Sequence, residues 1–169
     1  GISLHQAPLF IERGLDPTVA ATAVSIFALV SAISGFAYGF WPRRVPLRYA
    51  LALATFCLGA ASALMGSVAT AAQAYGAAAL FGAGLGGLIT TMPVAWADYF
   101  GRSSYGAIRG AALTIQTIAQ AAGPVMSGAL RDATGSYAAS VATFAALAFA
   151  GGLAALFAFP PGRRAALGR

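Results

Sequence analysis

No charged residue lies between Arg48 and Asp98, and this run of apolar and small residues constrains the fold more than any other feature. A helix needs about 20 residues to cross the hydrocarbon core of a bilayer, and the run is about twice that long. The interior of a soluble 169-residue domain is too small to bury it. We therefore predict two membrane-spanning helices here, separated by the polar dip at residues 66–73.

Three further stretches, residues 17–42, 111–130 and 133–162, are also free of charge. Backbone polar groups in hydrocarbon must bond within the protein, which makes helices the expected form of every span. The predicted fold class is all-α integral membrane, a bundle of five spans preceded by the end of another helix, with residues 1–169 as one transmembrane half-domain. The expected spans are residues 19–41, 47–68, 74–97, 107–130 and 137–159, followed by a cytoplasmic tail at residues 160–169.

The composition agrees with a membrane protein and removes the reason to invoke nucleic acid. The chain is 59% hydrophobic and 8% charged, with a mean hydropathy of +0.78, whereas soluble domains hold about 25% charged residues. A net charge of +6 would favour nucleic acid in a soluble protein. Membrane topology explains that charge instead, so we expect a lipid bilayer and no nucleic acid as partner.

Arginine supplies every basic residue, and its distribution predicts the orientation. Alternate loops and the tail hold Arg43, Arg44, Arg48, Arg102, Arg109, Arg163, Arg164 and Arg169. Arg13 and Arg131 fall in the other set of loops, each beside an acid. Basic residues gather on the cytoplasmic side of membrane proteins. We therefore expect a multi-pass protein of the cell (inner) membrane with a cytoplasmic C-terminus.

The sequence starts at Gly1, within an apolar stretch, and we expect a C-terminal fragment that begins near the outer end of a preceding span. The missing N-terminal half of the same chain would then be its main protein partner. Cys57 is alone and lies in the middle of a span, so no disulfide framework is expected.

Glycines at residues 82–87 match the GxGxxG spacing of dinucleotide-binding loops, but their setting does not. Such a site needs a preceding strand and an acid about 20 residues later, whereas these glycines lie inside an uncharged span. Clustered glycines followed by a proline weaken a helix and favour a bend. For glycines at this spacing we favour close helix packing, with a moving helix contact as the alternative. The gating candidates are Gly82, Gly84, Gly86, Gly87 and Pro93.

Uncharged polar side chains are the substrate-path candidates, because no ionisable residue lies near the middle of a predicted span. Gln116 and Gln120 share one helix face, and an unpaired amide is costly in lipid. We favour a cavity-lining role for this pair over hydrogen bonds between helices. For the hydroxyl side chains we favour hydrogen bonds to helix backbone. The candidates are Ser31, Ser34, Thr90, Thr91, Gln116 and Gln120.

Charges at the predicted cytoplasmic helix ends are candidates for a latch that breaks when the cavity opens inward. The residues are Arg43, Arg44, Asp98 and Arg109. Membrane topology alone, with these charges in solvated loops, explains them equally well, since a single exposed ion pair contributes little to stability. His5, near the external end, is a candidate for proton coupling, although a lone histidine at an interface is more often incidental.

The sequence holds no catalytic Ser/His/Asp set, no metal-ligand cluster and no phosphate-binding loop. A membrane enzyme would need polar catalytic groups gathered at one interface, and none gather here. We therefore predict no enzyme activity, no metal and no cofactor.

Several segments resemble a known transporter family. Residues 97–101 (ADYFG), 106–110 (GAIRG) and 123–137 (GPVMSGALRDATGSY) are similar to the region of the tenth to twelfth helices in the major facilitator superfamily (MFS). The resemblance is nearest to the branch of monocarboxylate and oxalate/formate carriers. Residues 5–8, 13–15 and 20–21 resemble the end of that branch's seventh helix and the approach to its eighth.

The resemblance implies that the five spans are helices eight to twelve of an MFS transporter. In that family helices seven, eight, ten and eleven line the substrate path, and here they carry the six polar candidates. Two features depart from the family pattern. Arg43 stands where the family's loop between helices eight and nine has an acid. No basic residue lies inside the eighth or eleventh helix away from its ends, which weakens a carboxylate substrate.

The predicted function is secondary active transport of a small solute, with organic anions as one candidate class. Transport would proceed by alternating access, driven by a coupling proton or ion or by substrate exchange. The alternative is a non-transporting polytopic membrane scaffold or a small dimeric membrane module.

Overall fold

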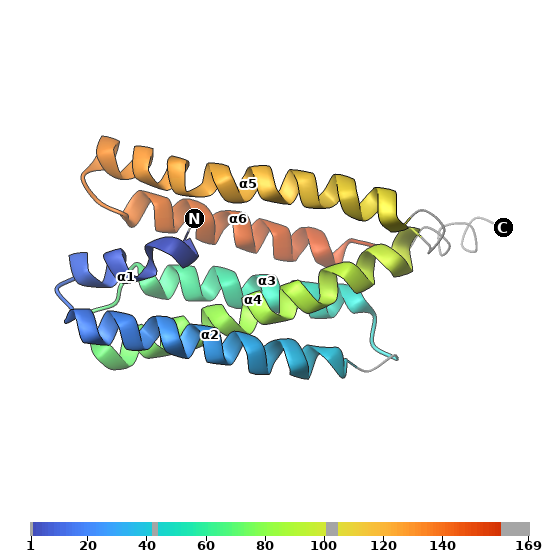
Figure 1. Ribbon diagram of the computed structural model, residues 1–169, viewed down its shortest axis with the longest axis horizontal. Coiled ribbons are helices and arrows are strands. Elements are labelled where there is room, and N and C mark those ends of the chain that lie inside the picture. Colours follow the sequence, from blue (N-terminus) through green and yellow to red (C-terminus); the bar gives the residue numbers. More distant parts are fainter. Residues whose placement is uncertain (1, 42–43, 101–104, 160–169) are drawn as a thin grey trace.

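Six α-helices make up the described part of the chain, which in this computed structural model comprises residues 2–41, 44–100 and 105–159, with side chains from Gln6 onward. Successive helices alternate in direction along the bundle (Figure 1). The all-α prediction is confirmed. The helices are α1 (Ile2–Glu12), α2 (Pro17–Gly39), α3 (Leu47–Met65), α4 (Ala71–Phe100), α5 (Tyr105–Thr134) and α6 (Ala138–Leu156).

Side chains cap two of these helices at positions that the sequence marks with turn residues. The Asp16 carboxylate accepts a hydrogen bond from the Thr18 backbone N–H at 2.7 Å, which lowers the pKa of Asp16, and Pro17 follows as the first residue of α2. At the start of α4, the Gln73 side-chain oxygen accepts from the Thr70 N–H, and the Thr70 hydroxyl accepts from the Gln73 N–H. This reciprocal capping box ends the polar dip between the two central spans.

Four helices, α2, α3, α4 and α6, are long and apolar enough to cross a membrane. This supports a multi-pass membrane protein. The fifth predicted span, residues 107–130, does form a helix, but α5 is not among the four candidates. The sequence prediction relied on the absence of charge, whereas Gln116, Gln120 and two threonines lower the hydropathy of α5. Whether α5 spans the membrane stays a prediction.

α4 is the central element of the bundle. It packs along α2 on one side and α3 on another, and α3 in turn packs along α6. α5 lies beside α6 in Figure 1 but makes few contacts with its neighbours. The described helices therefore divide into a tightly packed set (α2, α3, α4 and α6) and a loosely attached α5.

Glycines allow the backbones of the tightly packed set to touch. A Cβ atom added at Gly82 would lie 2.5 Å from the Phe27 carbonyl oxygen of α2, and one at Gly86 would overlap the Ser31 carbonyl oxygen. On another side of α4, a Cβ at Gly84 would lie 2.6 Å from the Ala54 carbonyl oxygen of α3. Small residues at these positions are what van der Waals association of helices in lipid requires.

The two ends of the bundle differ in charge and in packing. We call the end where α2, α4 and α6 finish the arginine end, because Arg44, Arg48 and Arg109 lie there among the described residues (Figure 1). The opposite, mixed-charge end carries Glu12, Arg13, Asp16, Arg131 and Asp132. A cluster of buried apolar side chains lies toward the mixed-charge end, where α1 packs mainly against α2.

The glycine contacts predict a clear difference between two alanine substitutions in α4. Gly86→Ala should lower the free energy of unfolding by about 1–3 kcal/mol, because the new methyl group forces α2 and α4 apart. Gly76→Ala is the matched control, since nothing lies within 4 Å of a Cβ at that position. Thermal unfolding in detergent micelles measures both, and equal melting temperatures would contradict the packing role of Gly86.

Candidate functional site

One face of α5 carries the glutamines that the sequence analysis places on a substrate path. Gln116 and Gln120 are followed at helical spacing by Gly123, Ser127 and Arg131, so all five lie along the same face. Gly123 and Ser127 are the buried residues of α5, whereas Gln116 and Gln120 are exposed. We call this face the glutamine face of α5.

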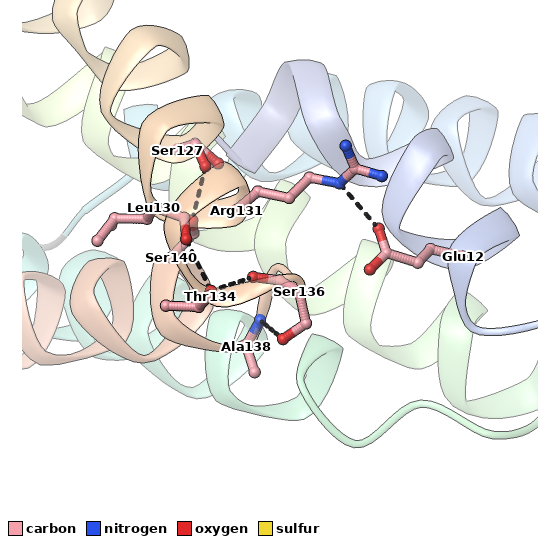
Figure 2. Close-up of polar contacts among 8 residues, drawn as sticks. All are labelled: Glu12, Ser127, Leu130, Arg131, Thr134, Ser136, Ala138 and Ser140. Atoms are coloured by element: carbon pink, nitrogen blue, oxygen red, sulfur yellow. Dashed lines mark hydrogen bonds and ion pairs between the residues drawn. The ribbon is translucent and has the colours of Figure 1, made fainter.

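The glutamine face is attached to α6 at the mixed-charge end. The Ser140 hydroxyl donates to the Ser127 carbonyl oxygen at 3.0 Å, and both serines are buried (Figure 2). At the turn between the helices, the Thr134 hydroxyl lies 2.7 Å from the Leu130 carbonyl oxygen of its own helix and 3.0 Å from the Ser136 carbonyl oxygen (Figure 2). Gly135 in this turn has φ +75°, a left-handed conformation that favours glycine.

An ion pair attaches the same end of α5 to α1. Nε of Arg131 lies 3.5 Å from a carboxylate oxygen of Glu12, and Figure 2 shows the arginine reaching across to α1. The guanidinium also lies over the Tyr137 ring, 5.2 Å from its centroid. At this end of α5, the glutamine face therefore points toward α6 and α1.

Farther along this face, toward the arginine end, the glutamines have no partners among the described residues. Neither Gln116 nor Gln120 makes a hydrogen bond there, and residues 113–122 of α5 are all exposed. This stretch of α5 is therefore a polar surface that no other described helix covers. This uncovered stretch is the candidate functional site.

The hydroxyl candidates occupy a different place, the contact between α2 and α4. The Ser34 hydroxyl donates to the Ala83 carbonyl oxygen at 2.7 Å, and the Thr90 hydroxyl donates back across the contact to the Gly35 carbonyl oxygen at 3.1 Å. Thr91 is buried and bonds to the Gly87 carbonyl oxygen of its own helix, while Ser31 packs beside Gly86. The structure does not bring these residues together with the glutamines.

The gating candidates are engaged in close packing. Gly82 and Gly86 face α2, Gly84 faces α3, and Gly87 lies under the Tyr38 ring, where an added Cβ would be 2.7 Å away. Pro93 lies inside α4, which continues as helix to Phe100. A gating role for these residues stays a prediction.

The latch candidates are not paired where they are described. Asp98, Arg44 and Arg109 are exposed, and no ion pair joins them within residues 44–100 and 105–159. Arg109 instead donates to the Tyr105 hydroxyl at 3.0 Å. Arg43 lies outside the described residues, as does the tail at residues 160–169.

Two polar side chains of the described residues, Gln6 and Arg48, each have a buried atom without a hydrogen-bond partner. Gln6 of α1 is fully buried, with Nε2 3.9 Å from the Met65 sulfur and Oε1 without a partner. Leu9 and Phe10, three and four residues later, share its face and are also buried, a spacing that the sequence does display. His5, which precedes Gln6, lies in α1, but its side chain is outside the described part.

Comparisons with known proteins add no family to this geometry. No protein-family model matches the chain, and no curated protein matches it. Within the described ranges, no three His, Cys, Asp or Glu side chains lie together as a metal site would require.

The hydrogen bonds between α2 and α4 predict that Ser34 contributes more than Ser25 to the stability of the folded protein. Ser34→Ala should lower the free energy of unfolding by about 0.5–1.5 kcal/mol, because the Ala83 carbonyl oxygen loses the hydrogen bond from the Ser34 hydroxyl. Ser25→Ala removes a hydroxyl that bonds only within its own helix, to the Ala21 carbonyl oxygen, and serves as the control. If unfolding in micelles gives equal losses, the contact between the helices does not depend on Ser34.

Proposed function

We propose that this chain forms half of a secondary transporter that moves a small solute by alternating access. The observation that carries the proposal is the uncovered glutamine face of α5. The resemblance to the MFS supports the same reading, because it identifies α5 with the eleventh helix, which lines the substrate path in that family. Organic anions are the first solutes to test.

The glutamine face fits a transport path for a physical reason. An amide left without a hydrogen-bond partner in hydrocarbon costs a few kcal/mol. Gln116 and Gln120 therefore need water, a solute or another helix against them. Their face continues into the contact with α6 and α1, which supports a position turned away from lipid. Water and solute would supply the missing partners in a central cavity.

The packing of the bundle supports the same mechanism. In alternating access, largely rigid bundles rock around a site near the midplane. The glycine contacts hold α2, α3 and α4 as one body, and α3 extends it to α6. The second half of the transporter would close the cavity from the side that α5 leaves uncovered.

The competing function is a dimeric or scaffolding membrane module. In that case a second copy of this chain would cover the glutamine face permanently, and no aqueous path would exist. The two functions differ in whether water reaches Gln116 and Gln120 in the assembled protein.

Thiol labelling decides between them. In a Cys57→Ala background, Gln116→Cys and Gln120→Cys should react with a membrane-impermeant, water-soluble thiol reagent, because a transport path is hydrated. Ile118→Cys is the control, since Ile118 lies half a turn away from both glutamines. Equal protection of the three cysteines in proteoliposomes would refute the aqueous path and favour a permanent helix contact.

Transport itself gives the second test. Gln116→Leu and Gln120→Leu should reduce solute uptake by the full-length protein in proteoliposomes by about tenfold or more, because each removes a polar contact worth about 1.4 kcal/mol or more. Ile118→Leu should leave uptake unchanged. Unaltered transport kinetics in both glutamine variants, at equal amounts of reconstituted protein, would exclude them from the site.

A further inference from the structure

Arg48 at the arginine end has an environment that the proposed transport does not explain. It lies in the first turn of α3 and is only partly exposed. Its guanidinium carbon lies 4.2 Å from the centroid of the Phe159 ring and 4.9 Å from that of Tyr49. Nη2 donates to the Tyr49 hydroxyl at 3.1 Å. The cation therefore contacts two aromatic rings and one ring hydroxyl.

No acid neutralises this cation within the described residues. The ion pair found there, between Arg131 and Glu12, lies at the opposite end of the bundle. A guanidinium has five N–H donors, and Nε of Arg48 is buried without an acceptor. A partly buried charge without a counter-ion is costly, so an external anion would be favourable here.

The depth of Arg48 identifies the source of that anion. The Tyr99 hydroxyl donates at 3.2 Å to the carbonyl oxygen of Ala158, the residue before Phe159. Tyr99 lies one residue before the end of α4, whose 30 residues extend about 45 Å, enough to cross a bilayer with its headgroups. Arg48 and Phe159 therefore lie near the end of α4, where a helix of this length that crosses a bilayer reaches the lipid headgroups.

The charges around Arg48 favour an anionic headgroup. Arg44 and Arg109 are exposed at the same end, and Asp98 is the acid there among the described residues. A guanidinium recognises phosphate through paired N–H donors, and basic clusters at a membrane surface attract anionic lipids. We propose that Arg48, held by Tyr49 and Phe159, binds the phosphate of an anionic phospholipid from the surrounding bilayer.

Native mass spectrometry of the full chain, titrated with phosphatidylglycerol or phosphatidylcholine in detergent, tests this site. The wild-type protein should bind phosphatidylglycerol more tightly than phosphatidylcholine. Arg48→Gln should weaken that binding by about tenfold or more, the effect of losing a charge-assisted hydrogen bond. Phosphatidylcholine binding should change little, because its headgroup carries no net charge.

Two matched controls separate a site from general electrostatics. Arg13→Gln removes the same charge at the mixed-charge end, and Arg44→Gln removes it at the arginine end from an exposed side chain. Both should retain most of the preference for phosphatidylglycerol. If Arg44→Gln weakens binding as much as Arg48→Gln, the surface attracts lipid diffusely and the Arg48 site is refuted.

Further outcomes decide the proposal even if Arg48→Gln does not fold. Tyr49→Phe removes only the hydroxyl that holds Nη2, and Arg48→Lys keeps the charge but loses the paired donors. Both should bind phosphatidylglycerol more weakly than wild type, and wild-type affinity in both would overturn the site. Competition by inorganic phosphate at equal concentration would likewise overturn it, since a free anion would then be the ligand.

Discussion

The contact between α2 and α4 is the interaction on which the rest of this bundle depends. Lipid provides no hydrophobic driving force between helices, so association must come from close packing and from hydrogen bonds between helices. Gly82 and Gly86 supply the first, because they let α4 touch the backbone of α2. Ser34 and Thr90 supply the second, and their hydroxyls reach carbonyl oxygens of the facing helix only because the backbones are so close.

The same requirement explains why α5 stands apart. Where α5 has glycines at residues 106, 110 and 128, nothing lies within 4 Å of an added Cβ, so none of them marks a close helix contact. Polar contacts at one end, through Ser127 and Arg131, hold it to α6 and α1. A helix attached in this way leaves most of its length available for another partner, whereas α4 has no free side of comparable extent.

Much of the fold follows from hydropathy and capping residues, but the assignment of polar side chains does not. The uncharged runs locate the long helices, and Asp16 and Pro17 mark the start of α2, because both signals are local. The partners of Ser34 and Thr90 depend on the register between two helices, which glycine contacts distant in sequence determine. For α5, absence of charge suggested a span equal to the others, whereas its glutamines reduce its hydropathy below theirs.

Arg48 and Gln116 present the same physical problem at different depths. Each is a polar group that the described residues leave incompletely paired, and each lies where the cost of that state depends on what surrounds the bundle. At the headgroup level a lipid phosphate satisfies Arg48 without any further protein. On the prediction that α5 spans the membrane, no headgroup reaches its middle, and Gln116 would need water or another helix. The depth of each group in the bilayer therefore determines which kind of partner completes the structure.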